Sequence, residues 1–256
     1  MRTIFLRGHK QMLNNGERID QLYAEDIQII QSSEVFSFSL DAVLLANFPR
    51  VPKRGRIIDL CAGNGAVGLF ISKKTQAAID QIELQPRLAD MGRRSIQLNQ
   101  LEQQMTMHTL DLKETFTQFK PDSMDLVVCN PPYFKELPTS KKNPNPYLAA
   151  ARHEIHATLE DVISVSSRLL KMNGHFALVH RPDRFLDIID CLRTYQIAPK
   201  RIQFVYPKEG KEANILLVEG IKYGKIEGLR FLPPLITYDH EGNYTQPVKE
   251  MLYGRG

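Results

Sequence analysis

Cysteine is scarce in this chain, and long apolar runs are missing from it. The three cysteines, Cys61, Cys129 and Cys191, are scattered and form no C-x-x-C pair, which argues against a disulfide framework or a zinc site. The apolar stretch at the N-terminus is too short for a secretory signal, and no run approaches the length that spans a bilayer. These absences predict a cytoplasmic protein without membrane contact and without a bound metal.

A strong excess of charge of either sign is also missing. The 256 residues carry a formal net charge of +4, and 43% of them are hydrophobic. This length and composition predict one globular unit with a large core. The mild positive charge permits a polyanionic partner but does not require one.

The order of the predicted elements is typical of a doubly wound α/β sheet. Short apolar strands alternate with helical stretches from Arg56 onward. The predicted strands cover 56–60, 79–84, 105–111, 124–130 and 175–180, and the predicted helices cover 66–74, 86–101, 158–174 and 183–195. An antiparallel pair over 201–206 and 214–220 is expected to close the sheet, and the tail after Gly224 shows no regular pattern.

The first fifty residues are predicted to form an extension ahead of this sheet. Polarity roughly alternates over 17–38, as in the stretches 27–30 and 35–38, and residues 31–34 between these two stretches have the composition of a turn, which predicts a β-hairpin. Ser39 stands where it could cap a short helix over 41–47. The predicted division is therefore a hairpin-and-helix extension over 1–50 and a larger domain over 51–256. Packing alone explains the extension at least as well as a binding role does.

The tetrapeptide Asn130-Pro131-Pro132-Tyr133 ends an apolar run that predicts a buried strand. The carboxyl end of a strand in an open parallel sheet is where ligands bind. Asn130 offers one acceptor and two donors, and the Pro131 carbonyl is free on a rigid backbone. These groups can accept two hydrogen bonds from a planar amino group while the Tyr133 ring stacks on the attached heterocycle. An ordinary Pro-Pro turn is the alternative for the tetrapeptide by itself.

A glycine-rich stretch over 59–65 follows the first predicted strand of the sheet. Gly63 and Gly65 permit a tight turn and a close approach of the backbone to a ligand. A pyrophosphate site needs glycine at the first position of the motif, where Cys61 stands. The carboxylate of Asp59 suits the methionyl ammonium of S-adenosylmethionine better than it suits a phosphate.

Two more acids are predicted at the ends of the next two strands. Glu83 can accept hydrogen bonds from both hydroxyls of a ribose, and Asp111 can accept one from an adenine amino group. Each alone is more often a solvated acid, but together with the loop and the tetrapeptide they follow the strand order of one continuous site. We therefore expect S-adenosylmethionine as the cofactor, bound by Asp59, Gly63, Gly65, Glu83, Asp111 and Asn130.

These motifs are similar to those of class I S-adenosylmethionine-dependent amino-group methyltransferases. Four blocks, 38–45, 130–134, 151–154 and 180–184, more closely resemble the bacterial tRNA1(Val) adenine-37 N6-methyltransferases, and the likeness runs from about Glu17 to the last residues. The family implies a Rossmann-like seven-stranded sheet whose last strand is antiparallel. Cys61 departs from the glycine that is usual at its position.

The resemblance also implies tRNA as the partner and an adenine as the target, unstacked and inserted into the site. Asn130 and the Pro131 carbonyl would hold the two N6 hydrogens, which makes Asn130-Pro131-Pro132-Tyr133 the catalytic tetrapeptide. Tyr133 and Phe134 would stack on the base, and Arg152 and Arg181 would contact substrate. Positioning can supply much of the barrier reduction, so no strong general base is needed.

Other functions remain open from the residues alone. The same tetrapeptide can accept a guanine amino group or a glutamine amide, so ribosomal RNA or a translation factor are alternative substrates. A non-catalytic RNA-binding module should show a broken tetrapeptide or a lost Asp59 or Glu83, and none is broken here. The residue at Cys61 disfavours a nicotinamide oxidoreductase. The histidines at 153, 156 and 180 match no standard metal spacing, and the sequence does not predict the oligomeric state.

Overall fold

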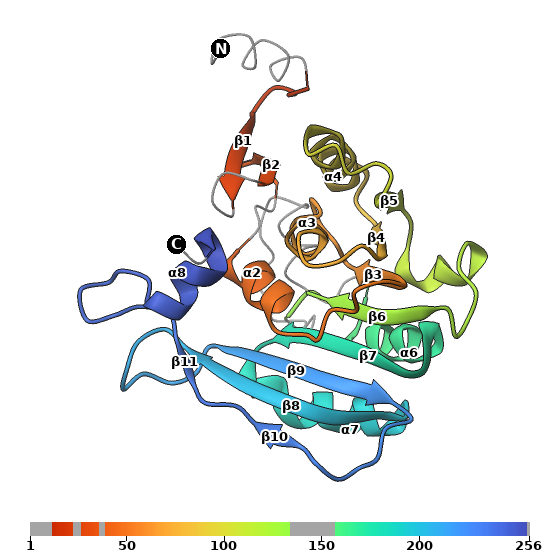
Figure 1. The fold of residues 1–256 in the computed structure, drawn as a ribbon, viewed down its shortest axis with the longest axis vertical. Helices are drawn as coiled ribbons and strands as arrows, with labels where there is room; N and C mark the ends of the chain where they lie inside the picture. The colour runs from red at the N-terminus through yellow and green to blue at the C-terminus, as the bar shows by residue number, and fades with distance from the viewer. Residues whose placement is uncertain (1–11, 23–26, 36–38, 134–156, 255–256) are drawn as a thin grey trace, which may run out of the picture.

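The structure is a computed structural model of the chain, and it describes residues 12–22, 27–35, 39–133 and 157–254. Its body is a mostly parallel sheet with helices on both faces (Figure 1). Seven strands form this body: β3 (Arg56–Leu60), β4 (Ala78–Glu83), β5 (Met105–Thr109), β6 (Met124–Cys129), β7 (Leu170–His180), β8 (Ile197–Tyr206) and β9 (Ile215–Lys222). They lie in the order β8-β9-β7-β6-β3-β4-β5, and β9 is antiparallel to both neighbours. The predicted Rossmann-like fold with an antiparallel last strand is confirmed.

The C-terminal tail adds structure that the sequence pattern did not predict. Two short strands, β10 (Arg230–Phe231) and β11 (Leu235–Ile236), pair parallel with β8 and extend the sheet beyond seven strands. The helix α8 (Gln246–Tyr253) follows them. Two-residue strands are too short to show a period-two pattern, so their pairing with β8 comes from the sheet rather than from local sequence.

The helices form two layers on the two faces of the sheet. Their bounds are α2 (Leu40–Asn47), α3 (Ala66–Ser72), α4 (Pro86–Leu98), α6 (Leu159–Leu169) and α7 (Phe185–Thr194), with the 3-10 turns η1 (Leu112–Thr117) and η2 (Pro182–Arg184). Side chains alternate along β3: Ile57 belongs to the core shared with α2, α3 and α4, whereas Ile58 and Leu60 belong to the core shared with α6 and α7.

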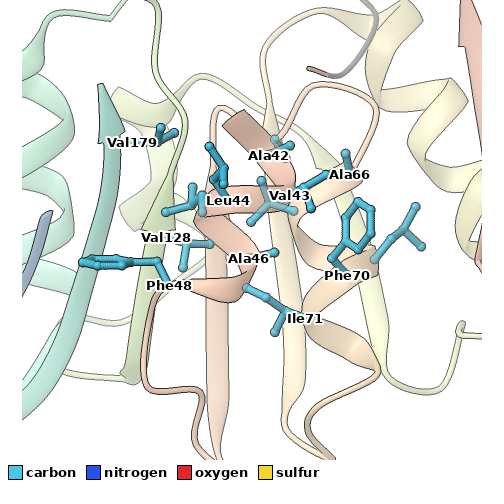
Figure 2. Close-up of a cluster of buried hydrophobic side chains, with 14 of the residues drawn as sticks. Ala42, Val43, Leu44, Ala46, Phe48, Ala66, Phe70, Ile71, Val128 and Val179 are labelled. Carbon is cyan, nitrogen blue, oxygen red and sulfur yellow. The ribbon is translucent and has the colours of Figure 1, made fainter. Parts of the chain in front are cut away.

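The middle of helix α2 is buried on every side. Residues 42–46 are all buried, and Figure 2 shows the α2 side chains between Phe70 and Ile71 of α3 and Val128 and Val179 of the sheet. A helix that is apolar all round must lie inside a core. The first turn of α2 therefore has a fixed place beside the sheet. The division at residue 50 stays a prediction, but α2 shares one core with the larger part of the chain.

An N-terminal hairpin is present, but the predicted pairing within it is wrong. The strands β1 (Glu17–Leu22) and β2 (Ile27–Ser32) pair antiparallel as a separate two-stranded sheet. Gln31, which was expected in the turn, belongs to β2, where its side chain is buried and donates a hydrogen bond to Asp20. Cross-strand partners thus satisfy polar residues whose local composition suggests a turn. The predicted second strand extends into residues 36–38, which lie outside the described residues.

The helix α6 begins as predicted and ends earlier. Thr158 and Asp161 form a capping box at its start, but the helix ends at Leu169 and not at Asn173-Gly174. Leu170 already pairs with Met124 of β6, and the register between β6 and β7 shifts immediately afterwards. Asn173 has a φ of 63°, so the polar residue and glycine mark a bulge inside a strand rather than a helix end.

Among the residues that the structure describes, no helix has both the length and the apolar character needed to cross a bilayer.

Candidate active site

A cavity of about 400 Å³ lies at the carboxyl ends of β3, β4, β5 and β6. Its walls come from the ends of these strands and the segments after them, at residues 61–64, 82–85, 110–112 and 130–133, and from Ser39, Asp41 and Ala42 at the start of α2. The cavity therefore brings together Gly63, Glu83, Asp111 and all four residues of the tetrapeptide, as the strand order predicts. Its volume is that of a small-molecule site.

Glu83 at the end of β4 is held in one orientation by the backbone. Its carboxylate oxygens accept hydrogen bonds of 2.8 Å from the N–H groups of Gly63 and Gln85. Burial raises the pKa of Glu83, while the backbone N–H groups act in the opposite direction. Each carboxylate oxygen retains a second lone pair, so the group can still accept hydrogen bonds from a diol in the cavity.

The loop after β3 uses left-handed backbone conformations. Gly63 has a φ of 57°, and no other described residue has an atom within 4 Å of the position that a Cβ there would occupy. Cys61 also has a φ of 57°, although L side chains rarely adopt this region. The glycine that is usual at position 61 is absent, but the backbone conformation that favours glycine is kept.

Asp59 does not reach the cavity. Its side chain is completely buried and accepts a 3.2 Å hydrogen bond from Gln81 Nε2, which also donates to the carbonyl of Gly65. Asp59 shares the face of β3 that Ile57 occupies, so it lies beneath the loop against α3. The geometry does not support the predicted contact between Asp59 and an ammonium group, and Gly65 likewise lies outside the cavity wall.

Burial sets the titration of Asp59. It raises the pKa of the carboxyl group to about 7, and the nearby charge of Glu83 contributes in the same direction. Within the described part of the chain, Asp59 Oδ1 is buried without a hydrogen-bond partner. Gln81, which sequence reasoning missed, is thus the side chain that connects this acid to the glycine loop.

Asp111 is the N-cap residue of η1 and lies just beyond the end of β5. Its Oδ1 accepts a 2.8 Å hydrogen bond from the N–H of Lys113 and caps the turn. Leu84, Leu110 and Leu112 line the same part of the cavity. A carboxylate beside an apolar wall suits a flat heterocycle that carries an amino group.

The tetrapeptide follows β6, which pairs with β3, so it forms the part of the cavity wall next to the glycine loop. The hydroxyl of Tyr133 lies 2.7 Å from Asn130 Oδ1 and 2.7 Å from Asp41 Oδ2. Burial, followed by the charge of Asp41, raises the pKa of Tyr133 well above its usual value. Sequence reasoning missed Asp41 as a site residue, although it lies inside the block at 38–45 that carried the family resemblance.

His180 packs behind Tyr133, with 5.1 Å between the two ring centroids. Its Nδ1 accepts a hydrogen bond from the N–H of Arg181, and burial together with Arg184 lowers its pKa to about 4. His180 is therefore neutral at physiological pH. Arg181 follows it on the surface but does not line the cavity. Phe134 and Arg152 lie outside the described residues.

Two buried polar atoms of the cavity wall test whether a polar ligand fits. Ser39 Oγ and Gln85 Oε1 have no hydrogen-bond partner among the residues that the structure describes. Such groups are costly to bury unless a ligand or water completes them. Together with Glu83, Asp111 and the open space at Gly63, they fit a nucleoside with a polar tail, as S-adenosylmethionine is. Within the same described residues, no cluster of three or more histidine, cysteine or acidic side chains could hold a metal ion.

This fold and cavity define a class I methyltransferase with S-adenosylmethionine as its cofactor. The chain belongs to the methyltransferase small domain family, whose sequence model matches residues 26–196.

The chain is also similar to individual proteins. The chain is 28% identical over 182 residues to a protein of Parabacteroides distasonis named tRNA1(Val) (adenine(37)-N6)-methyltransferase. This match covers 70% of this chain and 74% of the relative. A predicted O-methyltransferase from Agrobacterium tumefaciens has a similar fold, with a TM-score of 0.65, 22% identity, and coverage of 82% of this chain and 94% of that one. A geranyl diphosphate C-methyltransferase from Streptomyces coelicolor A3(2), crystallised with S-adenosyl-L-homocysteine, gives a TM-score of 0.53 at 11% identity over 71% of this chain and 74% of its own.

Proposed function

We propose that this protein transfers the methyl group of S-adenosylmethionine to the N6 amino group of an adenine in tRNA, at position 37 next to the anticodon of tRNA-Val. The observation that carries the proposal is the position of Asn130 and Pro131 in the wall of the cofactor cavity. Their two oxygens suit the two hydrogens of a planar amino group. The name of the Parabacteroides relative supports tRNA as the source of that group.

Residues at the ends of different strands contact different parts of the cofactor. Glu83 would accept hydrogen bonds from the ribose hydroxyls, and Asp111 would accept one from the adenine amino group beside the leucine wall. Gly63 leaves room for the close approach of the ligand, and Asn130 would hold the cofactor from the β6 side of the cavity. Asp59 and Gly65 act from behind the loop, where Gln81 joins them.

The reaction needs positioning more than proton transfer. S-adenosylmethionine supplies an electrophilic methyl group on a positively charged sulfur. Asn130 Oδ1 and the Pro131 carbonyl accept hydrogen bonds from the two N–H groups of the target amino group and direct its nitrogen toward the cavity. Pro132 keeps the backbone rigid between them and Tyr133. His180 is buried and poorly basic, so the amino proton leaves to solvent after transfer.

The RNA side of the site begins at Tyr133. Its ring, and that of Phe134, are the proposed stacking surfaces for the inserted base. Arg181, whose side chain is 40% exposed, and Arg152 are the proposed contacts with the RNA backbone. Because the target base lies in the anticodon loop and not in a duplex, less free energy is needed to unstack it.

Methyl transfer to bulk tRNA tests this function directly. The full chain is incubated with isotope-labelled S-adenosylmethionine and unmodified tRNA, and the digested nucleosides are identified by mass spectrometry. Labelled N6-methyladenosine is the expected product. Label in another nucleoside would support methyl transfer to tRNA but would contradict adenine as the target base. No label in tRNA, with cofactor binding intact, would overturn the substrate and direct the assay to ribosomal RNA and to a glutamine of a translation factor.

A further inference from the structure

Two side chains from distant parts of the chain, Asp41 and Asn130, converge on the hydroxyl group of Tyr133. Asp41 comes from the first turn of α2, and Asn130 and Tyr133 follow β6. Asp41 Oδ2 and Asn130 Oδ1 both lie 2.7 Å from the Tyr133 hydroxyl, and all three residues line the cavity. The buried helix α2 fixes the position of Asp41, so this convergence is a built feature of the site.

The number of protons in this group constrains its arrangement. A carboxylate oxygen and an amide oxygen can only accept, and a phenol has one proton, so Tyr133 cannot donate to both neighbours at once. Exchanging the positions of Oδ1 and Nδ2 leaves the shape of the Asn130 side chain unchanged. With Nδ2 facing the phenol, Asn130 donates to Tyr133 and Tyr133 donates to Asp41. Each of these two contacts then joins one donor to one acceptor.

We propose that Asp41 is a positioning residue, which acts through the Tyr133 hydroxyl to fix the Asn130 amide with its oxygen toward the substrate. The inference rests on the proposed transfer to an amino group, because only that substrate needs an acceptor at this point. In the opposite orientation the Asn130 NH2 group would face the NH2 group of the target, donor against donor. Asp41 thereby selects the orientation that can bind.

The surroundings of Tyr133 leave this role to Asp41. The ring of His180 lies against the ring of Tyr133, but its Nδ1 accepts from the N–H of Arg181, and its Nε2 makes no hydrogen bond to any described residue, the phenol included. The carboxylate of Asp41 is a stronger acceptor than an amide oxygen, so the phenol proton lies toward Asp41. The high pKa of Tyr133 agrees with a phenol that remains protonated beside a carboxylate.

A double-mutant cycle measures this coupling in the full-length protein. Asp41→Ala and Tyr133→Phe are expected to lower kcat for tRNA methylation by about tenfold each, since each removes one charge-assisted hydrogen bond of the chain. The double variant should also lose about tenfold, because the second change has nothing left to remove. Asp41→Asn keeps an acceptor and should recover most of the activity. The affinity for S-adenosylmethionine, measured by calorimetry, should change less than threefold in all four.

A second pair of the same chemistry provides the matched control. The hydroxyl of Tyr195 donates a 2.8 Å hydrogen bond to Glu160, and neither residue lines the cavity. Tyr195→Phe and Glu160→Ala should leave kcat unchanged. Melting temperatures of all variants identify any loss that comes from unfolding.

A spectroscopic measurement tests the chain of hydrogen bonds without any substrate. In nitrogen-15 labelled protein, the side-chain NH2 signal of Asn130 is the one that disappears in Asn130→Asp. This signal should shift in Tyr133→Phe and in Asp41→Ala, and it should stay in place in Tyr195→Phe. Because no methyl transfer is involved, the result does not depend on the identity of the substrate.

The outcomes separate the two proposals. If the signal shifts as expected but wild-type protein labels no adenosine, the positioning chain stands and the proposed substrate is wrong. If adenosine is labelled but the signal does not move, or the two losses multiply to about a hundredfold, Asp41 does not act through Tyr133. A rise in the cofactor dissociation constant with unchanged kcat in Asp41→Ala would also overturn the inference, because Asp41 would then serve the cofactor.

Discussion

The two halves of the cavity are built in different ways. The cofactor half comes from the consecutive strands β3, β4 and β5, and its central contact, Gly63 to Glu83, joins residues 20 positions apart. The acceptor half needs a contact between Asp41 and Tyr133, which are 92 positions apart. A parallel sheet brings its strand ends together through topology alone. The acceptor half depends in addition on how one buried helix packs against the sheet.

The largest expected effect is a loss of turnover caused by a substitution in the acceptor half. Asn130→Ala removes the proposed acceptor for the target amino group, so turnover should fall by about a hundredfold or more. The dissociation constant for S-adenosylmethionine should stay within a few-fold of wild type, as measured by calorimetry. An equal loss of cofactor binding would show that the two halves do not act separately.

The complementary change lies in the cofactor half. Glu83→Gln removes the charge that the ribose hydroxyls meet and places an NH2 group against a backbone N–H. We expect the dissociation constant for S-adenosylmethionine to rise by about tenfold to a hundredfold, as for the loss of a hydrogen bond to a charged group. Turnover at saturating cofactor should remain near wild type. A fall in turnover at saturation, with unchanged affinity, would contradict the assignment of Glu83.

The pH dependence of stability sharpens the role of Asp59. An aspartate ionises near pH 3.8 in the unfolded chain, but burial raises the pKa of Asp59 to about 7. Between these values the folded state holds a proton that the unfolded state has lost, so this residue lowers the free energy of unfolding as pH rises from about 4 to about 7.

The variant Asp59→Asn has no such proton. Its melting temperature relative to wild type should therefore increase between about pH 5 and about pH 8, by a few degrees for each 1 kcal/mol of difference. Cofactor affinity should change little, because Asp59 lies behind the loop. A difference that is constant with pH would show that Asp59 is not buried as an acid of raised pKa.

The smallest expected effect is on stability and concerns Cys61, the residue of the loop that is not glycine but has a left-handed backbone conformation. Cys61→Gly relieves about 1 kcal/mol of backbone strain and adds a similar loss of entropy on folding, so the free energy of unfolding should change by less than about 1 kcal/mol. Cys61→Val places a β-branched side chain in the same conformation and should be clearly less stable. Thermal unfolding of both variants measures this. Equal stability of the two would exclude strain at this position.

The sequence predicted what depends on strand order. Gly63, Glu83, Asp111 and the tetrapeptide lie in one cavity because each follows a strand whose apolar run is recognisable. It could not predict the direction of Asp59, because a residue near the end of a strand can point either to the cavity or into the layer behind. Asp41 shows a second limit, since its partner is determined by tertiary packing and not by spacing.

Two errors in the fold have the same origin. Asn173-Gly174 has the composition of a helix end, but pairing with β6 makes it a bulge in β7. Gln31 has the composition of a turn residue, but β1 pairs with it. In both cases a local preference of about 1 kcal/mol is overridden by hydrogen bonds to a strand elsewhere in the chain.

The position of β9 has a consequence for the order in which the chain can fold during synthesis. β9 is the last of the seven body strands to be made, but it lies between β7 and β8. Until it emerges from the ribosome, β7 has one unpaired edge and β8 has no partner in the sheet, which favours association with other chains. All described cavity residues are made before β9, since they lie at positions 39–157. A nascent or truncated chain can therefore contain the complete site and still lack the strand that closes its sheet.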